Sequence, residues 1–143
     1  MNALADIHIK VQTPGADANA RAVLRELESL LQRLLSTGEE ASIDLGSLPL
    51  NPEDYELLDA SLGKGEVSAE VDSLGVTQID ETGISGIWWV THYNADDEVM
   101  AEFLEVSWCP EILLTTQEDV SDGLEKLRAC LAQDVLAMED DNA

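Results

Sequence analysis

The spacing of apolar residues changes along the chain from a helical period to a strand period, and this change restricts the fold more than any other feature. In two segments before Gly63, residues 19–37 and 52–62, the apolar residues recur every three or four positions, and in several segments between Gly65 and Trp108 they alternate with polar ones. Periods of about 3.6 and 2 residues belong to helices and strands respectively. We therefore expect helices first, then a sheet.

Two helices are expected before the change of period. The first covers residues 19–37, with apolar residues along one stripe, Asp17 as its N-cap and Gly38 just beyond its last turn. The second follows Asn51 and runs to about Leu62. An Asx cap, then proline and acidic residues, is a strong signal for a helix start.

Strands are expected where apolar and polar residues alternate. Four such segments follow one another with short turns between them: residues 67–72, 77–81, 87–94 and 98–108. Consecutive strands joined by short turns predict an antiparallel meander. Shorter extended segments are expected at residues 7–11 and 42–45.

A third helix is expected near the end of the chain. It begins at Thr115 or Thr116, and Thr115 with Glu118 fits a capping box. Its apolar face consists of Val120, Leu124, Leu127, Leu131, Val135 and Met138. These elements predict an α+β fold, an antiparallel meander of about four strands packed with about three helices. We expect a single domain over residues 1–143, in which residues 1–17 are irregular or hold a short strand and residues 139–143 form a frayed acidic tail.

The charge of the chain limits its partners. The 143 residues include 30 Asp and Glu against 7 Lys and Arg, a formal net charge of −23. Phosphates would repel such a chain, so we expect neither nucleic acid nor an anionic membrane as a partner. From Gly65 to Glu125 there are fifteen acidic residues and no Lys or Arg. This block is either a solvated surface or a site for a basic partner segment.

The expected sheet has apolar residues on both faces. Trp88 and Trp89 are adjacent on one strand, so their rings point to opposite sides. Either helices cover both faces and the tryptophans are core residues, or one face is left for a partner or a second copy of the chain. In the second case one of Trp88, Trp89 and Trp108 is an interface anchor.

The sequence holds no recognisable catalytic or metal-binding constellation. No G-x-S-x-G motif occurs, the two histidines lack metal-ligand spacing, and Gly63-Lys64-Gly65 is too short for a phosphate loop. We therefore predict no catalytic residue, no metal site, no cofactor and no enzyme activity. Cys109 and Cys130 are expected to be reduced thiols. No apolar stretch approaches the roughly 20 residues of a membrane span and no signal peptide is apparent, so we expect a cytoplasmic protein.

Four sequence blocks carry a family resemblance: IDLGSLPL at residues 43–50, LGKGEVSA at 62–69, GIWWV at 86–90 and PEIL at 110–113. In this order they resemble the HupH/HyaF family of hydrogenase expression proteins, especially its C-terminal conserved domain. The resemblance extends from about residue 19 through the last helix. It implies an accessory protein or chaperone of [NiFe] hydrogenase maturation, linked to the iron–sulfur small subunit, with no catalytic residue or cofactor. The implied partners are the small subunit precursor and other maturation proteins.

Acidic residues and family resemblance together suggest a hypothesis for binding. The small subunit precursor of exported hydrogenases carries a basic signal segment, which the acidic sheet region would attract through Glu66, Glu70 and Glu102. The alternative is an iron–sulfur or metal carrier that uses Cys109 and Cys130, although iron–sulfur sites usually need four ligands. An enzyme and an acidic mimic of nucleic acid are further alternatives.

Overall fold

The computed structural model describes residues 17–133, which fall into two compact units. The first unit ends at Trp108 and contains the sheet with two helices, and the second begins at Cys109 and contains one helix. The strand expected at residues 7–11 and the tail at residues 139–143 lie outside the described residues, as do Val135 and Met138. Whether both units belong to one domain stays a prediction.

Both helices of the first unit are confirmed. Helix α2 covers Ala18–Thr37 and buries Ala20, Val23, Leu27, Leu30 and Leu34. Gly38 ends it in the left-handed conformation, with φ 75°, as expected of a C-terminal glycine. Asp17 stands at the N-cap position but its side chain makes no capping hydrogen bond; it pairs instead with Arg21 at 3.4 Å.

Helix α3 covers Pro52–Leu62 and begins with a complete capping box. The Asn51 side chain accepts a hydrogen bond from the backbone N–H of Asp54, and the Asp54 carboxylate accepts one from the backbone N–H of Asn51. The same carboxylate also accepts a hydrogen bond from the backbone N–H of Ala20, at 2.9 Å. Fully buried Asp54 therefore holds the N-terminal ends of α2 and α3 together.

The sheet has five antiparallel strands in the order β1-β5-β4-β3-β2. Four of them form the predicted meander: β2 (Ser68–Asp72), β3 (Val76–Glu81), β4 (Ile87–Tyr93) and β5 (Val99–Val106). The fifth, β1 (Ala41–Asp44), is the segment expected to be extended near residue 42, and it pairs with β5 at the edge of the sheet. The α+β class and the meander are confirmed.

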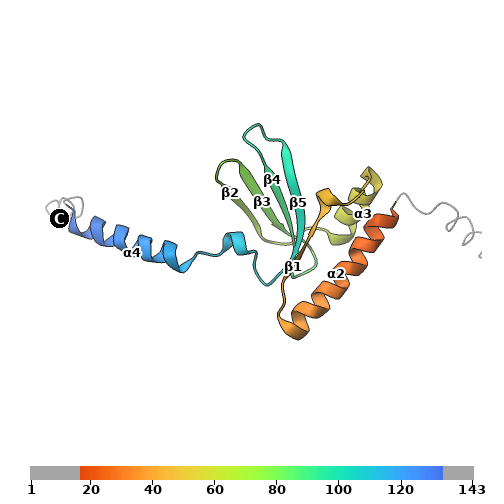
Figure 1. Ribbon diagram of the computed structural model, residues 1–143, viewed down its shortest axis with the longest axis horizontal. Helices are drawn as coiled ribbons and strands as arrows, with labels where there is room; N and C mark the ends of the chain where they lie inside the picture. The colour runs from red at the N-terminus through yellow and green to blue at the C-terminus, as the bar shows by residue number, and fades with distance from the viewer. Residues whose placement is uncertain (1–16, 134–143) are drawn as a thin grey trace, which may run out of the picture. The chain divides into compact units, whose positions relative to one another are not determined.

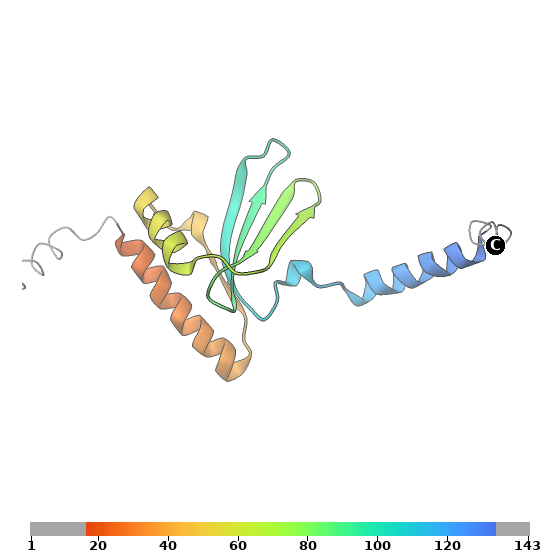
Figure 2. The ribbon, with the colours of Figure 1, turned by 180° about the vertical axis from the view of Figure 1, so that it is seen from behind.

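The two faces of the sheet differ in what covers them. Helices α2 and α3 lie on the same side of the sheet, near β5 (Figures 1 and 2). Their apolar residues form one core cluster with Ile43, Ile87, Leu104 and Val106, and half-buried Trp89 packs against this cluster. Ile79, Trp88 and Val90 point to the opposite face, where they are buried without belonging to that cluster. Apolar residues thus occupy both faces, as predicted.

Helix α4 (Gln117–Ala132) belongs to the second unit. The Thr116 side chain accepts a hydrogen bond from the backbone N–H of Asp119 at 3.1 Å, so Thr116 is its N-cap. The capping box expected of Thr115 and Glu118 is therefore placed one residue too early. Thr116 has an acidic residue, Asp119, three positions further on, so the same sequence signal fits both threonines. The apolar side chains of α4 are exposed: Val120, Leu124, Leu127 and Leu131.

Candidate functional site

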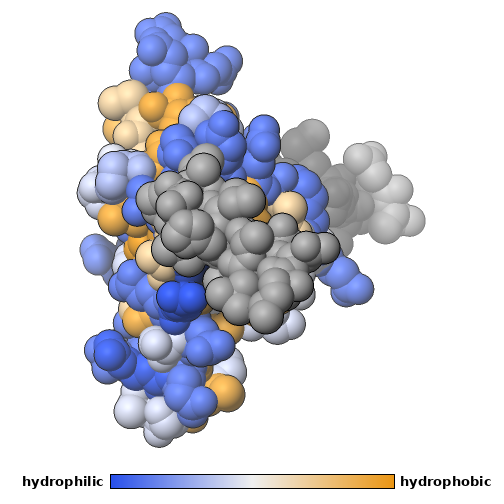
Figure 3. Space-filling model, turned by 90° about the vertical axis from the view of Figure 1, so that its right-hand side faces the viewer, coloured by the Kyte–Doolittle hydropathy of each residue, from blue (hydrophilic) through white to orange (hydrophobic). Residues whose placement is uncertain are grey.

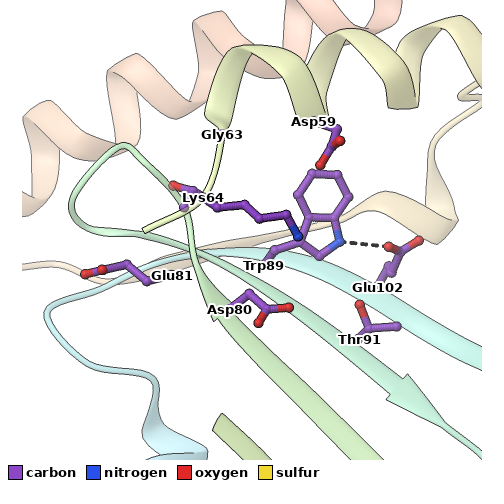
Figure 4. Close-up of a pocket in the computed structure, with 9 residues that line it drawn as sticks. Asp59, Gly63, Lys64, Asp80, Glu81, Trp89, Thr91 and Glu102 are labelled. Atoms are coloured by element: carbon purple, nitrogen blue, oxygen red, sulfur yellow. Dashed lines mark hydrogen bonds between the residues drawn. The ribbon is translucent and has the colours of Figure 1, made fainter. Parts of the chain in front are cut away.

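An acidic pocket lies in the first unit between the C-terminal end of α3 and the helix-covered face of β3, β4 and β5 (Figure 4). Its volume is about 250 Å³. The lining residues are Asp59, Gly63, Lys64, Asp80, Glu81, Thr82, Trp89, Thr91 and Glu102. Four carboxylates and one ammonium group give this lining a formal charge of −3. We call this site the acidic pocket.

Trp89 forms the centre of the acidic pocket. Its indole N–H donates a hydrogen bond of 2.7 Å to Oε2 of Glu102. Figure 4 shows the carboxylates of Asp59 and Asp80 on opposite sides of the indole, and Lys64 extending toward it. An aromatic ring surrounded by acidic groups suits a cation, because the ring face and the carboxylates both attract positive charge.

Strand pairing fixes the positions of the pocket residues. Asp80 of β3 pairs with Trp89 of β4, and Thr91 of β4 pairs with Glu102 of β5. Directly paired residues point to the same face of a sheet. The Asp80 carboxylate is further held by a hydrogen bond of 2.6 Å from the Ser68 hydroxyl. Asp80 and Glu102 are therefore positioned by the sheet, whereas Asp59 comes from α3.

The loop after α3 is tied to the end of β3. The backbone N–H of Gly65 donates to the carbonyl oxygen of Glu81 at 2.8 Å, and the N–H of Glu66 donates to the Glu81 carboxylate at 3.1 Å. A Cβ atom at Gly65 would lie 2.6 Å from the carbonyl oxygen of Thr82, which is too close. Glycine at this position lets the loop approach β3 and close one side of the pocket.

The negative potential of the pocket extends to Tyr55 on α3. Burial raises the pKa of the Tyr55 hydroxyl above its ordinary value of 10.0, and the nearby charges of Glu102 and Asp44 raise it further. A negative phenolate is disfavoured beside these carboxylates.

Two apolar grooves lie beside the C-terminal half of α2. One has a volume of about 440 Å³, and its lining includes Leu31, Leu34, Leu35, Trp88 and Trp108. The other has a volume of about 380 Å³ and shares Leu31 and Leu35 with the first. Seen from the side of α2 and α3, hydrophilic residues cover most of the visible surface and hydrophobic ones appear between them (Figure 3).

The structure separates the three tryptophans that were predicted as candidate anchors. Trp88 is 7% exposed and donates its indole N–H to the carbonyl oxygen of Ser107 at 3.2 Å. Trp108 is 63% exposed, and Trp89 is half-buried in the acidic pocket. Trp88 therefore has little surface to offer a partner, whereas Trp89 and Trp108 are accessible.

Of the three predicted glutamates, only Glu102 lines the acidic pocket. Glu66 touches its edge through the hydrogen bond to Glu81, and Glu70 is exposed on β2 opposite Gln78. A role of these glutamates and of the tryptophans in binding a partner stays a prediction.

Several pocket residues were not predicted as site residues: Asp59, Lys64, Asp80, Glu81 and Thr91. The sequence offers one local signal, a lysine between two glycines directly after a helix, which is too short for a phosphate loop and does not by itself indicate a pocket.

The cysteines are free thiols, with Cys109 half-buried and Cys130 exposed. Among residues 17–133, no three His, Cys, Asp or Glu side chains lie together so that they could hold a metal ion. No specific arrangement of ligands therefore favours the carrier alternative within this range. The search of the described helices for one long and apolar enough to span a membrane finds none.

Known proteins resemble this chain over most of its length. It is 34% identical over 121 residues to the hydrogenase expression/formation protein HoxQ of Azotobacter vinelandii, covering 82% of this chain and 42% of the relative. The protein HupQ of Azotobacter chroococcum, which has the same description, is 36% identical over 77% of this chain and 39% of its own length. The chain thus spans less than half the length of these curated relatives.

A solved structure and a family model agree with these relatives. The hydrogenase expression protein HupH from Thiobacillus denitrificans superposes with a TM-score of 0.78 at 41% identity, covering 81% of this chain and 97% of that one. The model of the HupH hydrogenase expression protein, C-terminal conserved region, matches residues 18–133. The chain therefore belongs to the HupH family, to which its sequence blocks had suggested a resemblance, and corresponds to the conserved C-terminal region.

Proposed function

We propose that this chain is a non-catalytic accessory protein of [NiFe] hydrogenase maturation that binds the precursor of the iron–sulfur small subunit during assembly. The printed descriptions of its relatives, hydrogenase expression or formation proteins, support the process. In this proposal the chain acts in the cytoplasm, together with other maturation proteins.

The observation that carries the proposal is the acidic pocket around Trp89. Protein interfaces are usually anchored by a few aromatic or arginine side chains, and charges around the anchor steer the partner into place. The pocket combines a half-buried indole with four carboxylates, so it supports recognition of a basic segment of a partner protein.

The test is co-purification of the full chain with the small subunit precursor. Tagged chain is expressed in cells that make the hydrogenase, and the bound proteins are identified by mass spectrometry at rising salt. We expect the precursor to be retained at low salt and released as salt screens the charges. Glu102→Gln should lower retention, with smaller losses for Glu66→Gln and Glu70→Gln. Absence of every hydrogenase subunit, or retention indifferent to salt and to all three substitutions, would contradict the proposal.

A homodimer through the sheet is the alternative interaction that the sequence leaves open. Light scattering coupled to size-exclusion chromatography tests it directly: a mass of twice 15.5 kDa supports the dimer, and a monomer mass at every concentration removes it.

A further inference from the structure

We propose that the acidic pocket is a binding site for one arginine side chain, presented by a basic segment of a protein partner. The identity of that partner rests on the function proposed above, whereas the ligand chemistry rests on the pocket itself. Arginine is planar and carries five N–H donors on a delocalised positive charge, so it needs several acceptors on different sides and favours an aromatic neighbour.

One hydroxyl in the pocket lining has no hydrogen-bond partner within the described residues and is open to the pocket. Thr91 is only 8% exposed, and no hydrogen bond joins its side chain to another group within residues 17–133. Among residues 17–133, the one fully enclosed side-chain polar atom without a hydrogen-bond partner is Oγ of Ser107, so the Thr91 hydroxyl is open to the pocket and a ligand can reach it. The hydroxyl belongs to the pocket lining, and Figure 4 shows its oxygen directed toward Trp89 and Glu102. A donor from a bound ligand would pair it.

Glu102 provides the strongest acceptor beside this hydroxyl. The indole N–H of Trp89 occupies its Oε2 and fixes the carboxylate in place, which leaves Oε1 for a ligand. Thr91 and Glu102 are paired across β4 and β5, so their side chains are neighbours on the same face of the sheet. A guanidinium group beside them would donate to both.

Two further features favour a positive charge in the pocket. Asp59 and Asp80 lie on either side of the indole, and the pocket is at the C-terminal end of α3, where Gly63 ends the helix. The carbonyl end of a helix carries a partial negative charge that stabilises cations. The flat indole offers its face to a stacked guanidinium.

The arrangement of the acidic groups and the volume of the pocket favour an amino-acid side chain as the ligand over a metal ion or a cofactor. No three acidic groups in the described part of the chain come close enough to hold a metal ion. The volume of about 250 Å³ lies below the roughly 300–1,000 Å³ of small-molecule pockets. A single extended side chain entering from a protein surface fits both observations.

Lys64 is the one basic residue of the lining, and it makes the proposal testable in both directions. Its side chain is exposed and extends toward Trp89 without an ion pair within 4.0 Å among residues 17–133. An incoming guanidinium would be repelled by this ammonium group. Removing the Lys64 charge should therefore tighten binding, while removing an acidic charge should weaken it.

The direct experiment uses the isotope-labelled full chain and the peptide acetyl-Gly-Arg-Gly-amide. Binding is followed by the indole N–H resonance of Trp89, which is assigned as the signal missing from a Trp89→Phe variant. Matched peptides with lysine or with neutral citrulline replace the arginine. We expect saturable movement of the Trp89 signal in the order arginine, then lysine, with no response to citrulline.

Variants then separate the pocket from the general charge of the chain. Glu102→Gln should weaken arginine binding about tenfold or more, and Thr91→Val about three- to tenfold. Thr91→Val removes an unpaired hydroxyl, so it should not lower the unfolding midpoint. Lys64→Gln should strengthen binding roughly two- to fivefold. The control is Glu98→Gln, which removes one charge from an exposed residue outside the pocket.

The outcomes distinguish this inference from the proposed function. A Trp89 signal that does not move, or equal weakening by Glu98→Gln and Glu102→Gln, would overturn the arginine site. If the precursor still binds Glu102→Gln and Thr91→Val normally while the peptide does not, the pocket is not the precursor's site and the inference about the partner is wrong. If the peptide binds but no hydrogenase subunit co-purifies, the arginine site stands and the proposed function fails.

Discussion

Replacing Asp54 with asparagine is expected to destabilise the first unit more than any other removal of a single charge from α3. The carboxylate is fully buried and accepts two backbone hydrogen bonds, from Ala20 at 2.9 Å and from Asn51 at 3.0 Å. Ala20 and Asp54 are each the third residue of their helices, so one side chain serves the N-terminal ends of both α2 and α3. Helix N-termini have unpaired N–H groups and a partial positive charge, which a carboxylate satisfies.

The magnitude follows from the number of acceptors lost. Asparagine keeps one oxygen, and its NH₂ group must face the other backbone N–H. A hydrogen bond to a charged group contributes about 1.5–3 kcal/mol, and the surviving bond loses the contribution of the charge. We expect a total loss of roughly 2–4 kcal/mol in the free energy of unfolding, within the usual range for a broken buried hydrogen-bond network.

Urea unfolding followed by circular dichroism measures this loss. With a slope near 2 kcal/mol per molar urea, the midpoint for Asp54→Asn should fall by roughly 1–2 M. The control is Glu53→Gln, which removes the same charge from the neighbouring, exposed position and should cost only about 0.3–1 kcal/mol. Equal shifts for the two variants would refute the reasoning, because the effect would then come from charge alone.

Three further predictions follow from burial and contact. The pKa of Tyr55 is raised in the folded chain, so the free energy of unfolding should fall as the pH rises above 10 and through that raised pKa. Glu102→Gln should lower the pKa of Tyr55, because it removes one of the charges that raise it. The ultraviolet absorbance of tyrosinate, compared with that of a Tyr55→Phe variant, measures this pKa. Trp88→Ala should cost about 3–5 kcal/mol in the free energy of unfolding because Trp88 is buried, whereas Trp108→Ala should change it by less than about 0.5 kcal/mol; similar urea midpoints for the two variants would contradict this. Gly65→Ala should lower the free energy of unfolding by about 1–3 kcal/mol and weaken binding of the arginine peptide, because the added Cβ atom would clash with the carbonyl oxygen of Thr82. Unchanged stability and unchanged peptide binding would show that the loop can move aside.

The elements of the fold were predictable because their signals are local. The leucine stripe of α2, the Asn51-Pro52 start of α3 and the alternation in β2 to β5 each lie within one stretch of sequence. The start of α4 was uncertain by one residue, because two adjacent threonines both have partners three positions further on. The local sequence pattern alone does not decide which of the two threonines is the N-cap.

Trp88 and Trp89 show where local patterns reach their limit. Their opposite directions follow from strand geometry, and both were predicted as possible anchors. Which ring would be buried depends on the elements around each face. In the structure the indole N–H of Trp88 donates a hydrogen bond to the carbonyl oxygen of Ser107 and the ring is almost fully buried, while Trp89 is half-buried beside the C-terminal end of α3.

The sequence by itself determined the α+β class, the meander, the strong negative charge and, through four short blocks, the family. Periodicity and charge can be obtained from neighbouring residues, so no three-dimensional information was needed. Only the tertiary structure decided which of thirty acidic residues share a site. Asp59, Asp80 and Glu102 come from a helix and two strands, and they meet around Trp89 because strand register and the packing of α3 place them there. Side chains far apart in sequence become neighbours only after the hydrophobic core has fixed that register.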